Sequence, residues 1–168
     1  MTQKVLGIAG YKNAGKTTLT SNLVRELVSR GHRVSTIKHA HHNFDIDHPG
    51  RDSHRHREAG AHEVAIVASR RWALLHELRD EDEPGMEDML AKLEPVDLVV
   101  IEGYRHGAIP KIEAVNAELD HPRLAGADPN VMAVATNGDR VAEPVPAFDR
   151  DDIPAIADFV EQLTGLKG

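Results

Sequence analysis

Residues 7–20 read GIAGYKNAGKTTLT, and the part from Gly10 to Thr17 fits the pattern G-x-x-x-x-G-K-[ST]. Glycines in such a loop let the backbone curl until successive N–H groups point inward at a phosphate. An apolar run at 4–9 precedes the loop and is typical of a buried strand, and apolar residues recur at helical spacing over 16–30. The motif therefore lies between a strand and a helix, and the N-terminus of that helix favours an anion.

This loop predicts how a nucleotide is held. We expect Lys16 to bring its charge to the β- and γ-phosphates, where it acts in catalysis, and Thr17 to offer its hydroxyl to Mg²⁺. The other loop residues are expected to contact the phosphates: Gly10, Tyr11, Lys12, Asn13, Ala14, Gly15 and Thr18. An accidental glycine-rich turn is the alternative. The pattern and its context favour a bound purine nucleoside triphosphate with Mg²⁺.

A second acidic contact with Mg²⁺ is expected at the end of a neighbouring buried strand. The run VDLVVI at 96–101 is the most strand-like in the chain, and Glu102 and the flexible Gly103 follow it. Ligands of open α/β sheets gather at the carboxyl ends of strands, so we predict Glu102 as a catalytic residue and, with Thr17, as a metal ligand. Asp97 lies at the opposite end of the strand and is not expected to reach the ion. A solvated strand end is the alternative for Glu102.

The sequence T-N-G-D at 136–139 indicates which base is bound. It follows the strand predicted at 131–135, where P-loop GTPases carry an N/T-K-x-D segment whose aspartate binds two N–H groups of guanine. Asp139 falls at that aspartate position, and Asn137 stands where lysine is usual. We therefore predict that Asn137 and Asp139 bind guanine, which makes GTP the expected nucleotide. A plain Asn-Gly turn is the alternative.

Strands and helices alternate along most of the chain. Strands are predicted at 4–9, 33–37, 63–68, 71–78, 96–101, 111–115 and 131–135, and helices at 16–30, 52–59, 86–93 and 152–164. Alternation of this kind predicts a three-layer α/β fold, the P-loop NTPase fold, with a mostly parallel central sheet flanked by helices. The 168 residues fit a single nucleotide-binding domain, 1–168, with a histidine-rich insertion or switch-like segment at about 39–60.

Composition excludes several kinds of chemistry. The chain has no cysteine, which rules out disulfides, thiolate metal sites and a cysteine nucleophile. Its formal net charge of −7 predicts no nucleic-acid partner, since such binding needs a basic surface. No apolar run approaches the roughly 20 residues of a membrane helix, and the N-terminus leaves no room for a signal peptide. We therefore expect a cytoplasmic protein that has no membrane partner.

Seven of the 11 histidines lie between residues 39 and 62. In a P-loop protein this region follows the second strand, where a switch-type loop approaches the γ-phosphate. Asp45 or Asp47 could hold the attacking water or a Mg²⁺-bound water there, and we predict Asp45 as catalytic. Three arginines could grip a phosphate: Arg51, Arg55 and Arg57. A Zn²⁺ or Ni²⁺ site is an alternative, although no established ligand spacing supports it, and a solvated loop is another.

Four segments together are more specific than the phosphate loop alone. They read GYKNAGKTTL from residue 10, TIKHAHHNFDIDHPGRDSHRHREAGA from 36, DLVVIEGYR from 97 and IPKIEAV from 109. With this combination the chain resembles the MobB family, molybdopterin-guanine dinucleotide biosynthesis protein B, over residues 4–139. The resemblance implies a GTPase-like P-loop protein, typically a homodimer, with weak GTP binding and slow hydrolysis.

The resemblance also implies a role. MobB proteins assist the enzyme that attaches GMP, taken from GTP, to molybdopterin in molybdenum cofactor synthesis, and so resemble adaptors more than transferases. The expected partners are that GMP-transferring enzyme, a second copy of the chain, which could pair through an edge strand near 71–78, and molybdopterin. Two other functions stay open: a metallochaperone GTPase whose histidine loop, including His41 and His42, delivers a metal, and a small-molecule kinase. A scaffold with a structural nucleotide is the non-enzymatic alternative.

Overall fold

The computed structural model describes residues 3–40, 44–104, 107–140 and 143–166. The chain divides into two compact units. The first is made of residues 1–39 and 86–168, and the second is the continuous stretch 40–85. In the described parts of the chain, no helix is both long and apolar enough to cross a membrane.

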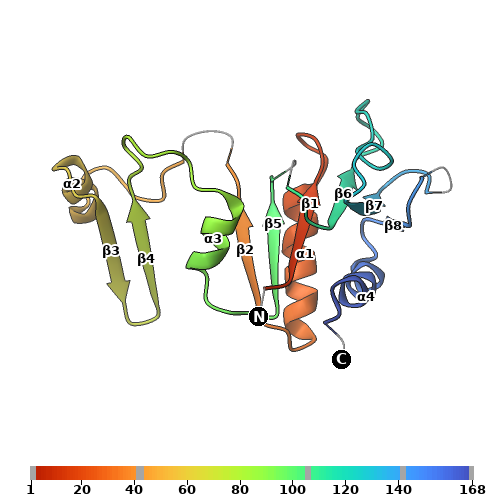
Figure 1. The fold of residues 1–168 in the computed structure, drawn as a ribbon, viewed down its shortest axis with the longest axis horizontal. Helices are drawn as coiled ribbons and strands as arrows, with labels where there is room; N and C mark the ends of the chain where they lie inside the picture. The colour runs from red at the N-terminus through yellow and green to blue at the C-terminus, as the bar shows by residue number, and fades with distance from the viewer. Residues whose placement is uncertain (1–2, 41–43, 105–106, 141–142, 167–168) are drawn as a thin grey trace. The chain divides into compact units, whose positions relative to one another are not determined.

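The first unit is built on a six-stranded sheet in which every paired strand runs parallel to its neighbour (Figure 1). Its strands are β1 (Val5–Ala9), β2 (Val34–Lys38), β5 (Leu98–Glu102), β6 (Lys111–Val115), β7 (Val131–Thr136) and β8 (Ala147–Asp149). Their order in the sheet is β2-β5-β1-β6-β7-β8. Because all six are parallel, their carboxyl ends meet at one edge, and the loops that follow β1, β5 and β7 lie along it.

Helices cover both faces of this sheet. Helices α1 (Lys16–Ser29) and α4 (Ile153–Thr164) share one core with the inward-facing residues of β1, β5, β6 and β7. Helix α3 (Met86–Lys92) packs on the opposite face. The alternation is plain in β5, where Leu98 and Val100 belong to the first core and Val99 and Ile101 to the second. A strand buried on both faces needs a continuous apolar run, which explains why this stretch is the most strand-like in the sequence.

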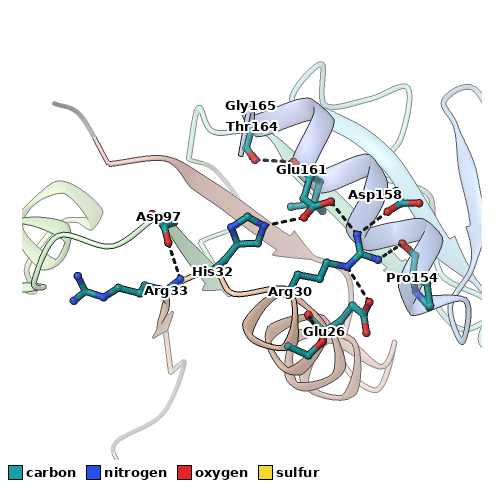
Figure 2. Close-up of polar contacts among 12 residues, drawn as sticks. Glu26, Arg30, His32, Arg33, Asp97, Pro154, Asp158, Glu161, Thr164 and Gly165 are labelled. Carbon is teal, nitrogen blue, oxygen red and sulfur yellow. Dashed lines mark hydrogen bonds and ion pairs between the residues drawn. The ribbon is translucent and has the colours of Figure 1, made fainter. Parts of the chain in front are cut away.

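A polar network ties the end of α1 to α4 (Figure 2). The Arg30 guanidinium donates to Glu26 Oε1 at 2.9 Å, Asp158 Oδ1 at 2.6 Å and Glu161 Oε2 at 2.9 Å. His32 Nε2 lies 2.8 Å from the other oxygen of Glu161, whose side chain is only 1% exposed. Since a buried carboxylate is costly unless it is paired, these contacts let Glu161 stay inside and fix the two helices against each other.

The second unit contains helix α2 (Asp52–Glu58) and an antiparallel hairpin of β3 (Glu63–Ala68) and β4 (Arg71–His76). The hairpin is a two-stranded sheet of its own. Several of its large apolar side chains are exposed: Ile66, Val67, Trp72 and Leu74.

The predicted α/β fold with a parallel sheet flanked by helices is confirmed. The strands predicted at 63–68 and 71–78 both form, the second only as far as His76, but they build the separate hairpin rather than part of the central sheet. Strand β8 was not predicted, because three residues carry too little periodic signal. The last helix is capped at its start, since the Asp152 side chain accepts a hydrogen bond from Ala155 N at 3.2 Å.

Candidate nucleotide-binding site

The loop between β1 and α1 has a backbone that only particular residues can adopt. Gly10 has φ +140° and Gly15 has φ +97°, and Asn13 between them has φ +63°. A Cβ atom on Gly10 would lie 2.5 Å from Ala114 O of the neighbouring strand, so a side chain there would collide with backbone. The first glycine of the motif is thus required both by its dihedral angle and by the close approach of β6.

Lys16, the first residue of α1, folds back over this loop. Its Nζ donates to Gly10 O at 2.9 Å and to Tyr11 O at 2.7 Å. Partial burial lowers the pKa of Lys16 from its ordinary value; Glu102 opposes this effect and Lys38 adds to it. An ammonium held in this way is positioned at the mouth of the loop, where a phosphate would compensate the cost of its desolvation.

Thr17 and Glu102 meet at the carboxyl edge of the sheet. Thr17 Oγ1 donates to Glu102 Oε1 at 2.9 Å, although the two residues lie 85 positions apart in the sequence. Glu102 is 8% exposed and its Oε1 also lies 3.6 Å from Lys38 Nζ, because Lys38 is the register partner of Glu102 across the β2–β5 pair. Asp97, at the other end of β5, instead accepts a hydrogen bond from Arg33 N at 2.7 Å.

This donor set suits a hard cation. Mg²⁺ prefers oxygen ligands at about 2.0–2.1 Å in an octahedron, in which adjacent ligands are separated by roughly 2.9 Å. The hydroxyl and carboxylate oxygens of Thr17 and Glu102 stand at that separation. A groove of about 390 Å³ opens beside them, between α1 and the end of β2.

The T-N-G-D segment begins with Thr136, the last residue of β7, at the same edge. Thr136 Oγ1 accepts from Gly138 N at 3.0 Å, which shapes the turn. The side-chain amide of Asn137 contacts the loop after β6: Oδ1 accepts from Ala117 N at 2.8 Å and Nδ2 donates to Asn116 Oδ1 at 3.1 Å. Asn137 therefore joins two loops, and Asp139 is exposed two residues further on.

Two contacts support the phosphate loop from the side of β6. The Tyr11 ring stacks on the His121 ring, with centroids 4.8 Å apart and planes 20° from parallel. Glu113, which is 1% exposed, accepts hydrogen bonds from Leu124 N at 2.9 Å and Ala125 N at 2.8 Å. These contacts hold the loop after β6 beside the phosphate loop.

Asp45 belongs to the second unit, and its contacts there are structural. Its Oδ1 accepts from Asp47 N at 2.9 Å and from Arg57 Nη1 at 2.9 Å, and these bonds lower the pKa of Asp45. Arg57 Nε also donates to Glu77 Oε1 at 2.6 Å. The carboxylate of Asp45 thus helps to fix the loop that precedes α2. His41 and His42, the ligands considered for a metallochaperone, lie outside the described residues.

Comparison with known proteins gives the family. Residues 5–137 match the model of the family described as MobB, Molybdopterin guanine dinucleotide synthesis protein B. The chain belongs to the MobB family.

Relatives in the family span nearly its whole length. The chain is 42% identical over 160 residues to the molybdopterin-guanine dinucleotide biosynthesis adapter protein of Haemophilus influenzae, covering 94% of this chain and 87% of the relative. The Escherichia coli protein of the same name is 36% identical, with coverage of 93% and 90%. A crystal structure of a MobB homolog from Bacillus stearothermophilus superposes with a TM-score of 0.71 at 26% identity, over 97% of this chain and 99% of that one.

Three residues of the candidate site in this MobB-family protein were not predicted. Lys38 is paired with Glu102 through the strand register, which requires knowing that β2 and β5 are neighbours. His121 lies in the loop after β6 and Glu113 binds the backbone of that loop, and the position of the loop can be known only from the fold. The alternation of charged and apolar residues in KIEAV could have drawn attention to Glu113, but that pattern is also typical of a strand with one solvated face.

Proposed function

We propose that this chain is an adapter protein of molybdopterin-guanine dinucleotide biosynthesis that binds GTP with Mg²⁺ and assists the attachment of GMP to molybdopterin. The observation that carries the nucleotide part is the contact between Thr17 and Glu102 at the mouth of the Gly10–Thr17 loop. The role in the pathway is supported by the names of the H. influenzae and E. coli relatives.

The phosphates would be held by the loop backbone from Gly10 to Thr18. Backbone N–H groups at the start of α1 favour the anion, and Lys16 would exchange its bonds to two loop carbonyls for phosphate oxygens. Thr17 and Glu102 would hold Mg²⁺, which when bound would neutralise charge on the β- and γ-phosphates. Lys38, beside Glu102, would add a second positive charge at this edge.

Guanine selection would rest on Asp139. The segment after β7 is fixed to the loop after β6 through Asn137, so Asp139 is carried by an anchored turn rather than by a mobile loop. A carboxylate can accept from both N1 and N2 of guanine, whereas adenine offers no such pair of donors at that edge. The role of Asn137 in this proposal is to position the turn.

Hydrolysis is expected to be slow. Lys16, the loop N–H groups and a Mg²⁺ ion held by Thr17 and Glu102 would stabilise the negative charge that develops on the phosphates. None of the described residues that line the groove beside Thr17 is an arginine that could act as an arginine finger. We expect turnover of the isolated chain below about 1 s⁻¹, the low end for kinases. Asp45 remains a prediction as a catalytic residue, since its described contacts are confined to the second unit.

The decisive experiment is a calorimetric titration of GTP and ATP, with and without Mg²⁺. GTP should bind more tightly than ATP, and Asp139→Ala should weaken GTP roughly 10- to 100-fold, the equivalent of one or two hydrogen bonds to a charged group, while leaving ATP unchanged. Glu102→Gln should remove the Mg²⁺ dependence. Glu87→Ala, which removes an exposed carboxylate on α3, is the control for lost charge.

Equal affinity of the native chain for GTP and ATP would refute the guanine assignment. The adapter role is tested separately, by measuring GMP transfer to molybdopterin by the transferring enzyme with and without this chain. No change in that rate, together with no binding to the enzyme, would refute the role while leaving nucleotide binding intact.

We further propose that the chain is a homodimer that pairs through the hairpin of the second unit. Val67 is 78% exposed, Trp72 71% and Leu74 50%, which is a large apolar surface for two short strands. Both β3 and β4 also have one edge that no other described strand covers. Apolar side chains beside open strand edges are the features by which two copies of a chain pair.

A further inference from the structure

Three potential metal ligands gather at the open end of the β3–β4 hairpin. His62 comes just before β3, His76 is the last residue of β4, and Glu81 lies in the turn that follows. One ligand atom from each of the three lies within 4.8 Å of the others. Nothing in the sequence spacing suggests this group, because the hairpin brings His62 and His76 together.

The distances are close to those of a tetrahedral metal site. His76 Nε2 lies 3.2 Å from both carboxylate oxygens of Glu81, and His62 Nε2 lies 3.6 Å from Glu81 Oε1. With metal–ligand bonds of about 2.0–2.1 Å, tetrahedral ligand atoms are separated by roughly 3.3 Å. The two imidazole rings pack edge to face with centroids 4.6 Å apart. Small side-chain rotations would therefore bring a nitrogen of each ring within bonding distance of the same metal ion.

A fourth residue orients one of the ligands. His76 Nδ1 lies 2.8 Å from Glu63 Oε1, its cross-strand register partner. When Nδ1 carries the proton and donates to that carboxylate, Nε2 is left as the acceptor and points toward Glu81 and His62. A carboxylate behind a histidine ligand is the usual arrangement by which proteins fix the ring and raise its basicity toward a metal.

The backbone that carries these residues is held without a metal. Glu77 N donates to His62 O at 3.2 Å, which continues the hairpin by one pair, and Glu81 N donates to Leu78 O at 2.6 Å. Arg79, with φ +48°, reaches back so that its guanidinium donates to Ala61 O at 3.0 Å. The turn that bears Glu81 is therefore tied to the segment before β3 that bears His62.

From this geometry we propose that His62, His76 and Glu81 bind one divalent transition-metal ion of the Zn²⁺ type. Two imidazoles and one carboxylate suit Zn²⁺ or Ni²⁺ rather than Mg²⁺ or Ca²⁺, which prefer all-oxygen sites. Three protein ligands leave a coordination position open to water or to a group from a partner. The site lies within the second unit and uses none of the residues proposed to bind GTP.

The test is a titration of the metal-stripped full-length chain with Zn²⁺, followed by calorimetry and by histidine NMR signals. One Zn²⁺ per chain should bind with shifts at His62 and His76, and His62→Gln and His76→Gln should each weaken binding at least tenfold. Glu63→Gln should weaken it about tenfold, as expected for a residue that orients a ligand. His56→Gln, at an exposed histidine of α2, is the matched control and should bind as the native chain does.

Two results with Zn²⁺ would overturn the proposal. One is Zn²⁺ affinity that is unchanged in both His62→Gln and His76→Gln, which would place the bound metal at other histidines. The other is the absence of shifts at His62 and His76 when the native chain is saturated with Zn²⁺, a result that does not depend on how any variant folds. Mg²⁺ added alone should shift neither residue, and shifts with Mg²⁺ would contradict the assignment to a transition metal.

Discussion

Replacing Gly10 by alanine tests whether the close approach of two strands shapes the phosphate loop. Gly10 has φ +140°, and a Cβ atom there would stand 2.5 Å from Ala114 O, when real Cβ atoms keep at least 3.0 Å. The carbonyl belongs to the backbone of β6, so it cannot rotate out of the way as a side chain would. The start of the loop must instead move away from β6 by about 0.5 Å or more.

The expected cost has two parts. An L-residue in the left-handed region loses about 1–2 kcal/mol, and an extra methyl group in a packed site costs about 1–3 kcal/mol. Together these give about 2–5 kcal/mol, and each kcal/mol lowers the melting temperature of a chain of this size by about 2–4 °C. GTP affinity should fall at least tenfold, because the displaced N–H groups no longer converge on one phosphate.

The chain offers two controls for the first part of the cost. Gly31, after α1, has φ +95°, and a Cβ atom added there would have no other atom within 4 Å, so Gly31→Ala carries the backbone strain without the collision. It should lose about 1–2 kcal/mol and bind GTP as the native chain does. Gly15, with φ +97° and the same open space around an added Cβ atom, places the same strain inside the loop.

The assays are thermal unfolding and calorimetric titration with GTP and Mg²⁺ on all three variants. Gly10→Ala should be the least stable of the three variants and should lose more affinity for GTP than Gly15→Ala. If Gly10→Ala unfolds at the temperature of Gly31→Ala and binds GTP as the native chain does, the contact with β6 does not shape the loop.

Three further outcomes are expected. Arg30→Ala should cost about 3 kcal/mol in unfolding free energy, because it leaves a buried carboxylate of α4 without its guanidinium; Asp158→Ala, at a side chain 67% exposed, should cost less than about 1 kcal/mol. Asp128 holds buried Lys111, and that bond lowers the pKa of Asp128 below 3.8. Its stabilisation is therefore complete above pH 3.8 and lost as pH falls through the lowered pKa, so the stability gap between the native chain and Asp128→Asn, about 3 kcal/mol at pH 7, should close in acid. Trp72→Glu should give a monomer by light scattering, because a charge on the exposed apolar face of the hairpin opposes its burial between two copies. GTP affinity should stay within about twofold, because Trp72 is not among the residues proposed to bind the nucleotide; a dimer that persists would refute pairing through the hairpin.

Local patterns predicted the parts of the site that depend on neighbours in sequence. The phosphate loop follows from one motif between a strand and a helix, and the position of Glu102 follows from the end of an apolar run. The opposite placement of Asp97 follows from the same run and is confirmed by its bond to Arg33 N at the far end of β5. In each case the residues that determine the conformation lie within about one turn or one strand of the feature itself.

The parts that were missed depend on contacts between distant segments. The sequence KIEAV alternates charged and apolar residues, which is typical of a strand with one face in water. Yet Lys111 and Glu113 are each 1% exposed. Their charges are compensated by Asp128 and by two backbone N–H groups of a loop 11 or more residues away, and periodicity carries no information about such partners.

The placement of the hairpin could not be predicted for a similar reason. EVAIVA and RWALLH read as strands, and both form, but apolar residues occur on both faces and so fit a central sheet as well as a surface hairpin. The exposed Trp72 and Val67 show which alternative the chain adopts. An apolar pattern predicts that a strand is buried. It does not indicate whether the surface that buries the strand belongs to the same chain or to a second copy.

The strand order separates the two tasks proposed for the nucleotide site. Glu102 ends β5 on one side of β1, whereas the turn that carries Asp139 follows β7, two strands away on the other side. With strands about 4.8 Å apart, β7 lies roughly 10 Å from the phosphate loop. The residues proposed for the metal and for the base therefore share no contact. Substitutions of Glu102 and of Asp139 should act additively on GTP affinity, because energetic coupling requires contact or a shared partner.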